Sequence, residues 1–371
     1  MYDQIRGDTF YIMLYGAVAM MSLMASCYLL FRRANAIAPD VTSSVRLRRW
    51  TAAFFACMTL SHLWYMPIAF LTSSEDIMLS YIAGAVLDFM TLIPSAIILL
   101  LVMLQDRRRP LWPVCVIVTP PIVGLAIGFV SRSIAYLPLL YAYYLLLGIG
   151  LILYMVHEVR GYGGWLRDNY VDLEHKEVWQ SFIVLAIIML VFGIYSFSFK
   201  SMACTYMTQV NNMILICYLL WRVETLSDLT IPVNDVEEET REGDEPPHAP
   251  SSVVRTNIGL LLNKYCEEPQ LYLQHDLTLL QLAQAIGINR FYLSQYFSSL
   301  GMNYNAYINN LRINHFISLC REAVAAQSSV TAQQLAFKSG YRSYNTFRNA
   351  FKRKTGVSVT DWMRKTGWGN P

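Results

Sequence analysis

A pattern of small, apolar and polar residues occurs twice in the last third of the chain, in a form suited to binding DNA. Residues 281–283, Gln-Leu-Ala, are followed by Gly287, and 53 positions later residues 334–336 repeat this order before Gly340. Each copy predicts a helix, a turn at the glycine and a second helix, because glycine readily adopts the left-handed conformation that ends a helix. Two helices joined in this way form a helix-turn-helix, whose second helix enters the DNA major groove.

The rest of the chain is far more apolar, and the charge falls into three blocks. Apolar residues make up 55% of the 371 positions and charged residues 15%, which is typical of an integral membrane protein with a soluble part. Residues 1–222 carry 15 Lys and Arg against 12 Asp and Glu, residues 223–251 carry 1 against 9, and residues 252–371 carry 13 against 5. The overall charge of +3 therefore says little about partners.

Seven apolar stretches come first, each about as long as the roughly 20 residues that a helix needs to cross a membrane. Because lipid offers the backbone no hydrogen-bond partners, such stretches must be helical. They lie at roughly residues 10–31, 51–71, 79–104, 111–130, 134–156, 178–199 and 202–221. We therefore expect an all-α protein with a seven-helix transmembrane bundle over residues 1–222, a linker over 223–251 and a soluble domain over 252–371.

Basic residues in the connections predict the orientation, since Lys and Arg accumulate on the cytoplasmic side of a membrane. The first, third and fifth connections hold 11 of them, whereas the segments on the opposite side hold 3. The amino terminus is therefore expected outside. An odd number of spans then places the carboxy-terminal domain in the cytoplasm, at the inner membrane of a bacterium.

Two ionisable residues, His62 and Asp88, lie within predicted spans, where a charge is costly and often functional. They reach a similar depth in neighbouring antiparallel helices, so a pair between them, or a role in sensing, is one hypothesis. The alternative is that each side chain satisfies a backbone group or a tyrosine hydroxyl of a neighbouring helix.

Two connecting segments have a composition of their own. Residues 223–251 combine an acidic run with Pro246, Pro247 and Pro250, which predicts a disordered linker. The fifth connection, residues 165–179, mixes Leu, Val and Trp with charged residues, which predicts a short helix along the membrane surface. The seven cysteines lack paired spacing, so we expect neither disulfides nor a metal site, and no cofactor.

The repeated part resembles a known family. The segments DLTLLQLAQAIGINRFYLSQYF and TAQQLAFKSGYRSYNTFRNAFKRKTGVSVTDWM, with the matching pair GMNYNAYI at 301–308 and GVSVTDWM at 356–363, are similar to AraC/XylS transcription regulators, in the style of membrane-tethered sequences from Bacteroidetes. The resemblance covers roughly residues 255–366. It implies seven helices, with two helix-turn-helix units joined by a long helix at about residues 305–325.

By the same motif match, the recognition helices are residues 289–297 and 343–351. The resemblance makes their outward positions candidates for base contacts, because Arg can address guanine, and Asn or Gln adenine, through paired hydrogen bonds. These candidates are Arg290, Phe291, Ser294 and Gln295 in the first unit and Ser343, Tyr344, Asn345, Arg348 and Asn349 in the second. The basic run after the second helix suits phosphate and consists of Lys352, Arg353 and Lys354.

The first unit departs from the family pattern. Gln295 stands where Arg is frequent, and Ser298 and Ser299 stand where basic residues usually follow. We therefore expect the second unit to supply more of the salt-dependent affinity for DNA.

These observations favour a one-component regulator in which the membrane part senses a signal and the cytoplasmic domain binds promoter DNA. The sequence does not indicate which ligand carries the signal. Its other expected partners are the lipid bilayer, with a second copy and RNA polymerase as further candidates. The alternative is a transporter or receptor with an appended regulatory domain. An enzyme is disfavoured because His157-Glu158 lacks the second His of a zinc protease helix and no GxSxG motif occurs. A histidine kinase is disfavoured because no ATP-binding segment follows the spans.

Overall fold

The structure, a computed structural model, is helical apart from its connections, which confirms the expected all-α class. The chain divides into two compact units, residues 1–162 with 175–231 and residues 163–174 with 232–371. The described residues are 7–32, 34–39, 41–132, 137–197, 202–229, 252–326 and 330–365.

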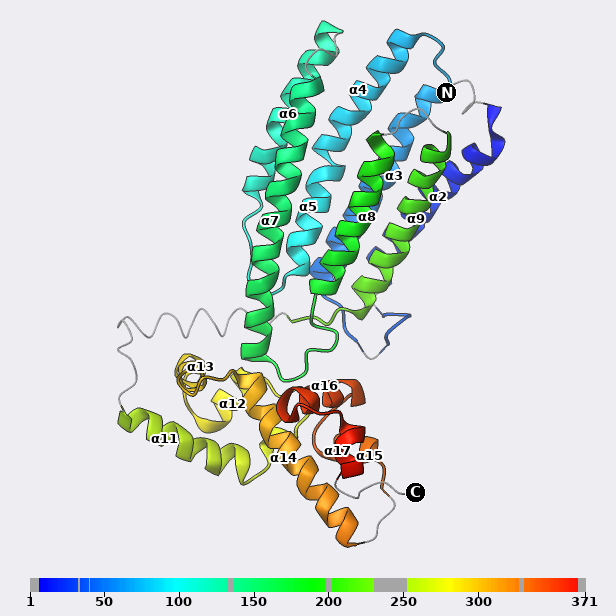
Figure 1. Cartoon of the computed structure of the whole chain (residues 1–371). Coiled ribbons are helices and arrows are strands. Elements are labelled where there is room, and N and C mark those ends of the chain that lie inside the picture. The colour runs from blue at the N-terminus through cyan, green and yellow to red at the C-terminus, as the bar shows by residue number, and fades with distance from the viewer. Residues whose placement is uncertain are drawn as a thin grey trace. The chain divides into compact units, whose positions relative to one another are not determined.

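The first unit is a bundle of long apolar helices that lie side by side (Figure 1). They are α2 Thr9–Phe31, α3 Val45–Tyr65, α4 Ser74–Met90, α5 Leu92–Met103, α6 Trp112–Ser131, α7 Leu137–Asn169, α8 Trp179–Phe197 and α9 Met202–Thr225, with a 3₁₀ turn at Met66–Ala69. Helix α2 packs against α3 and α9, while α3 also packs against α5. Helix α4 packs against α6, and α8 packs against α9.

Five segments of the bundle, rather than the predicted seven, are long and apolar enough to cross a membrane, as judged over the described residues. The sixth predicted stretch contributes only a shorter apolar helix, Trp179–Val191, within that part of the chain. The seventh coincides with α9, where Gln209, Asn211 and Asn212 interrupt the apolar sequence midway, so the prediction of a span there was wrong. The five segments are Thr9–Phe31, Val45–Ala69, Ser74–Met103, Trp112–Ser131 and Leu145–Asn169.

The chain leaves the bundle through a fixed segment after α9. Helix α9 continues to Thr225, and Leu226 and Leu229 are buried, so this stretch is packed although the predicted linker began at residue 223. The Gln105 side chain holds the segment: its Nε2 donates to Ser227 O at 3.0 Å, and its Oε1 accepts from Leu229 N at 2.8 Å. The rest of the predicted linker, residues 230–251, lies outside the described residues.

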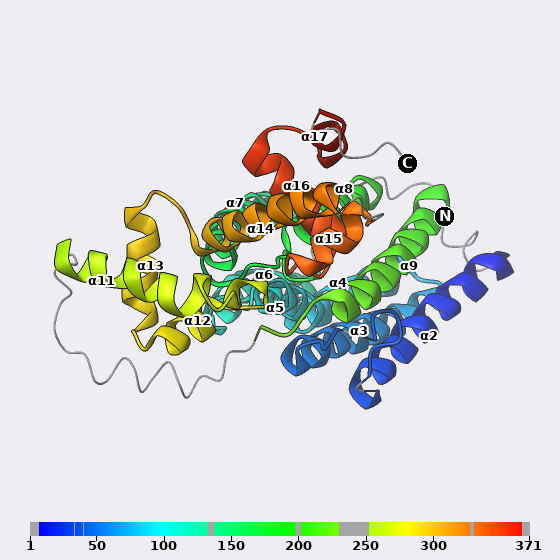
Figure 2. The same ribbon diagram turned by 90° about the horizontal axis from the view of Figure 1, so that it is seen from below.

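The second unit contains the helices that the family resemblance implied. They are α11 Ser252–Leu262, α12 Leu279–Ile286, α13 Arg290–Ser299, α14 Tyr304–Ala325, α15 Ala332–Lys338, α16 Tyr344–Thr355 and α17 Val359–Lys365. Figures 1 and 2 show α14 running from the group α11–α13 to the group α15–α17. The predicted long helix at residues 305–325 is therefore confirmed to within one residue.

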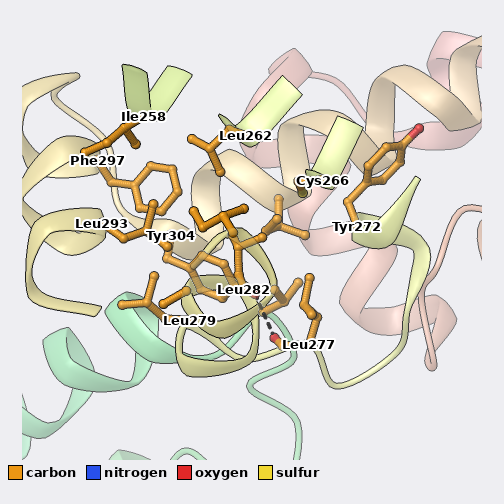
Figure 3. Packing of buried hydrophobic residues seen from close by; sticks show 14 residues of the cluster. Ile258, Leu262, Cys266, Tyr272, Leu277, Leu279, Leu282, Leu293, Phe297 and Tyr304 are labelled. Atoms are coloured by element: carbon orange, nitrogen blue, oxygen red, sulfur yellow. Dashed lines mark hydrogen bonds between the residues drawn. The ribbon is translucent and has the colours of Figure 1, made fainter. Parts of the chain in front are cut away.

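Each half of this unit has its own apolar core. Around α12 and α13, the buried side chains of Leu282, Leu293 and Phe297 gather with Tyr304, whose hydroxyl donates to Leu277 O at 3.0 Å (Figure 3). Around α15 and α16, the ring of Phe316 on α14 lies 4.4 Å from that of Phe347, between ring centroids. Helix α14 thus contributes one end to each core.

The fifth connection differs from its prediction. No separate helix covers residues 165–179: α7 continues through Trp165 to Asn169, and residues 170–178 are non-helical. The surface-helix prediction was wrong because the apolar residues of this segment extend α7 and are buried, among them Leu166, Val171 and Val178. Residues 163–174 belong to the second unit.

Candidate nucleic-acid interface

The first helix-turn-helix unit is fixed by local hydrogen bonds at both of its helix starts. Thr278 caps α12 in a capping box with Gln281, which satisfies two backbone N–H groups that a helix start leaves free. Gly287 ends α12 with φ 71°, a left-handed conformation that glycine adopts without strain. Asn289 then caps α13 by accepting from Phe291 N at 2.7 Å. The residues that determine how α13 follows α12 are therefore local: the two caps and the glycine turn between them.

The second unit repeats this construction. Thr331 and Gln334 form a capping box at the start of α15. Gly340 has φ 87°, and a Cβ added there would lie 2.7 Å from the Leu273 carbonyl oxygen, so only glycine fits. Ser343 precedes α16, as Asn289 precedes α13. The internal repeat predicted from the sequence is confirmed in the capping boxes and the glycine turns, whereas Ser343, unlike Asn289, makes no capping hydrogen bond through its side chain.

A buried arginine on α14 joins the two units. The Arg312 side chain is 1% exposed, and its Nε donates to Tyr272 O at 2.7 Å and its Nη2 to Gln274 O at 2.6 Å. Its guanidinium carbon lies 5.5 Å from the centre of the Tyr341 ring, which follows the turn of the second unit. Nearby, His275 Nδ1 lies 3.0 Å from Gly340 O. These contacts tie the loop before α12 to α14 and to the turn between α15 and α16.

Sequence reasoning missed Arg312. The available signal was its position between Ile308, Ile313 and Phe316, the inward-facing stripe of α14, where a charged residue is unusual. Burial lowers the pKa of its guanidinium, and Tyr341 and Tyr304 are the main groups that oppose this shift. The two carbonyl acceptors stabilise a charge that burial alone would disfavour.

The candidate base-contact residues of the first unit are only partly available on α13. Phe291 is 50% exposed at the first turn of α13, whereas Arg290 and Ser294 are half-buried. Gln295 is half-buried as well, and its Oε1 is buried without a hydrogen-bond partner among the described residues. The surface of α13 is therefore mainly aromatic and neutral.

The second helix-turn-helix presents a more polar and basic surface on α16 than the first presents on α13. Asn345, Arg348 and Asn349 are exposed along one face, while Ser343 and Tyr344 are half-buried. The Tyr344 ring packs 5.7 Å from that of Phe347, between centroids, so part of it belongs to the core.

The basic run after α16 divides in two. Lys352 and Arg353 are exposed. Lys354 is already engaged, because its Nζ donates to Asn310 O at 2.8 Å and to Asn314 Oδ1 at 2.6 Å. Partial burial also lowers the pKa of Lys354. This lysine therefore ties α16 to α14, a role that the sequence did not indicate.

The two ionisable residues of the bundle have separate partners. His62 places Nδ1 2.8 Å from Met58 O and Nε2 3.2 Å from Gln209 Oε1, which links α3 to α9. Asp88 Oδ1 accepts from Trp64 Nε1 at 3.1 Å. These hydrogen bonds therefore join different groups, and the pairing of His62 with Asp88 stays a hypothesis.

Comparison with known families agrees with this geometry. Residues 282–365 match the model of a family described as a helix-turn-helix domain, here of the AraC type. The match begins in α12 and ends in α17, so it includes both units and α14. The C-terminal third therefore carries an AraC-type helix-turn-helix domain, a family of DNA-binding regulators rather than enzymes. No curated protein and no solved structure matches the chain.

Proposed function

We propose that this protein is a membrane-bound one-component transcription regulator, whose carboxy-terminal domain binds promoter DNA under the control of the membrane helices. The observation that carries the proposal is the pair of capped helix-turn-helix units on one continuous helix, within a segment that matches a DNA-binding family. Its placement in a bacterial inner membrane, with this domain in the cytoplasm, rests on the apolar helices and on the basic connections between them.

The length of α14 supports binding to successive turns of DNA. Its 22 residues span about 33 Å at 1.5 Å each, close to the roughly 34 Å of one DNA turn. Helix α13 packs on the first turns of α14, where Phe297 meets Tyr307, and α16 packs on its middle, where Phe347 meets Phe316. One helix therefore holds both recognition helices, and we propose that both enter the major groove on one face of the duplex.

The two helices are proposed to contribute differently. On α16, Arg348 and Asn349 are the groups suited to base edges, and Lys352 and Arg353 are suited to phosphate. On α13, Phe291 is suited to apolar contact with a thymine methyl group, beside the half-buried Arg290. The salt dependence of binding should therefore come mainly from the second unit.

Sensing is proposed to act through the polar contacts inside the bundle. The hydroxyl of Tyr15 on α2 donates to His62 O at 2.6 Å, and the His62 ring meets Gln209 on α9, so three helices join at this residue. A signal that rearranges these contacts would shift α2, α3 and α9 relative to one another.

Mapping of bound chromosomal DNA tests the proposal. Cells that express the full chain should yield discrete enriched loci, and cells that express a chain ending at residue 251 should yield none. Uniform recovery of DNA from both strains would contradict sequence-specific binding.

A further inference from the structure

The segment that follows the fifth membrane helix forms part of the second unit. Val171 is 2% exposed and lies in the same apolar cluster as Leu279 and Leu282. The Asn305 amide Nδ2 donates to Tyr170 O at 3.1 Å and to Val171 O at 2.6 Å. Tyr170 also forms an antiparallel bridge with Thr278. These backbone contacts give residues 170–174 a defined place on the domain.

These contacts fall at the starts of three helices. Thr278 caps α12, Asn305 is the second residue of α14, and Thr346 in the first turn of α16 donates its hydroxyl to Glu174 Oε2 at 3.2 Å. In a helix-turn-helix, the first turn of the recognition helix makes the base contacts. Glu174, at the end of this segment, therefore lies against the part of α16 that DNA would need.

The segment is negatively charged, as DNA is, because it contains Asp172 and Glu174. Asp172 is 7% exposed, and its Oδ1 accepts from Glu174 N at 3.0 Å, which orders the loop. The Glu174 carboxylate lies at the start of α16, where the helix dipole favours a negative group. A phosphate and this carboxylate repel each other and satisfy the same positive end of the helix, so both cannot occupy it at once.

We propose that residues 170–174 are a built-in competitor of DNA, which covers the first turn of α16 until the fifth membrane helix withdraws them. This inference rests on the proposed function, since it names the regulation of the same DNA-binding surface.

The fifth membrane helix leads directly into residues 170–174. Helix α7 runs without interruption from Leu137 to Asn169, and its residues from Gly163 onward belong to the second unit. Gly163 and Gly164 stand at this boundary, and a Cβ added at either would meet nothing within 4 Å. Glycine lowers the stability of a helix interior, so such a pair is one kind of site at which a helix can bend. A movement of α7 can thus be absorbed here or passed on to the competing segment.

A cysteine pair in the full-length protein in lipid nanodiscs tests the competition. Oxidation of the Glu174→Cys, Thr346→Cys double variant should form a disulfide that lowers affinity for a duplex enriched from a random pool at least about tenfold, and reduction should restore it. Excess duplex should slow the cross-link. Thr346→Cys alone, oxidised in parallel, is the control for the loss of the hydroxyl.

A charge variant gives an independent reading. Glu174→Ala should bind the duplex about fivefold more tightly, because removal of one charged hydrogen bond raises the fraction of uncovered domain. Glu177→Ala is the matched control. It removes one charge from the same connection, but Glu177 belongs to the compact unit that contains the membrane bundle, so the affinity for the duplex should be unchanged.

Two results would overturn the competition while leaving the proposed function intact: no cross-link between positions 174 and 346, or a cross-linked protein that binds the duplex as well as the reduced one. Failure of every form, including the reduced protein and Glu174→Ala, to prefer any duplex would instead refute DNA recognition itself.

Discussion

Replacement of Arg312 by Ala should uncouple the two helix-turn-helix units. The substitution removes two hydrogen bonds from a charged group, each worth about 1.5–3 kcal/mol, and leaves the buried carbonyl of Tyr272 without its donor. Release of the guanidinium from its buried site offsets part of this loss, since burial of a charge costs several kcal/mol. We expect a net destabilisation of about 3 kcal/mol.

Two buried thiols allow this change to be measured separately in each half of the domain. Cys266 lies in the core around α12 and α13, and Cys320 lies in the core around α15 and α16. Burial raises the pKa of each thiol to about 12, so both should resist alkylation until their half of the domain opens. Peptide mass spectrometry after brief alkylation at increasing urea concentrations then gives, for each half, the urea concentration at which half of its thiol has become reactive.

In the wild type, Cys266 and Cys320 should become reactive at the same urea concentration. In Arg312→Ala both midpoints should fall by about 1.5 M, for a urea slope of about 2 kcal/mol per M, and they should separate. Arg321→Ala, an exposed arginine on the same helix, is the control. The reasoning would be refuted if both midpoints of Arg312→Ala stayed within about 0.3 M of this control, since the measured loss would then be below about 0.6 kcal/mol.

Three further predictions concern individual side chains. Arg348→Ala should cost about 1–3 kcal/mol in binding to the selected duplex and relax its sequence preference at one position, as measured by competition with single-base variants. Lys352→Ala should reduce the salt slope of DNA binding by about one. Lys354→Ala should instead lower the urea midpoints of unfolding, because Lys354 ties α16 to α14. Equal salt slopes for the two variants would contradict this division. Asp88→Asn should change the output of a promoter reporter in cells, and an unchanged output would remove Asp88 from sensing.

The local structure of the DNA-binding domain could be predicted from its sequence because local residues determine it. Gly287 and Gly340 mark turns through a backbone conformation that glycine favours, and the apolar stripe of α12 recurs in α15. The positions of α13, α14 and α16 therefore followed to within a few residues at each end.

Contacts between distant segments were not predictable in the same way. The sequence predicts that Lys354 contacts DNA phosphate, because it follows two other basic residues. In the structure its partners are Asn310 and Asn314, which lie on a helix 40 or more residues earlier. The span prediction failed at α9 for a different reason: Gln209, Asn211 and Asn212 interrupt the apolar sequence, so this helix is not among the five segments apolar enough to cross a membrane.

The place of residues 170–174 is a third case. Val171 and its neighbours have the composition of a membrane-surface segment, but Val171 fills a core formed by residues that follow it by 87 to 137 positions, from Ile258 to Ile308. Only the folded chain brings Asn305 and Thr278 to the backbone of this loop.

The central claim is that one polypeptide joins a membrane bundle to a sequence-reading DNA-binding domain. Its most direct test is the affinity of the full-length protein, in nanodiscs of bacterial lipid, for a duplex enriched from a random pool and for a scrambled duplex of the same composition. The account predicts that the enriched duplex binds at least about 10³-fold more tightly at physiological salt. Equal affinity for the two duplexes would contradict it.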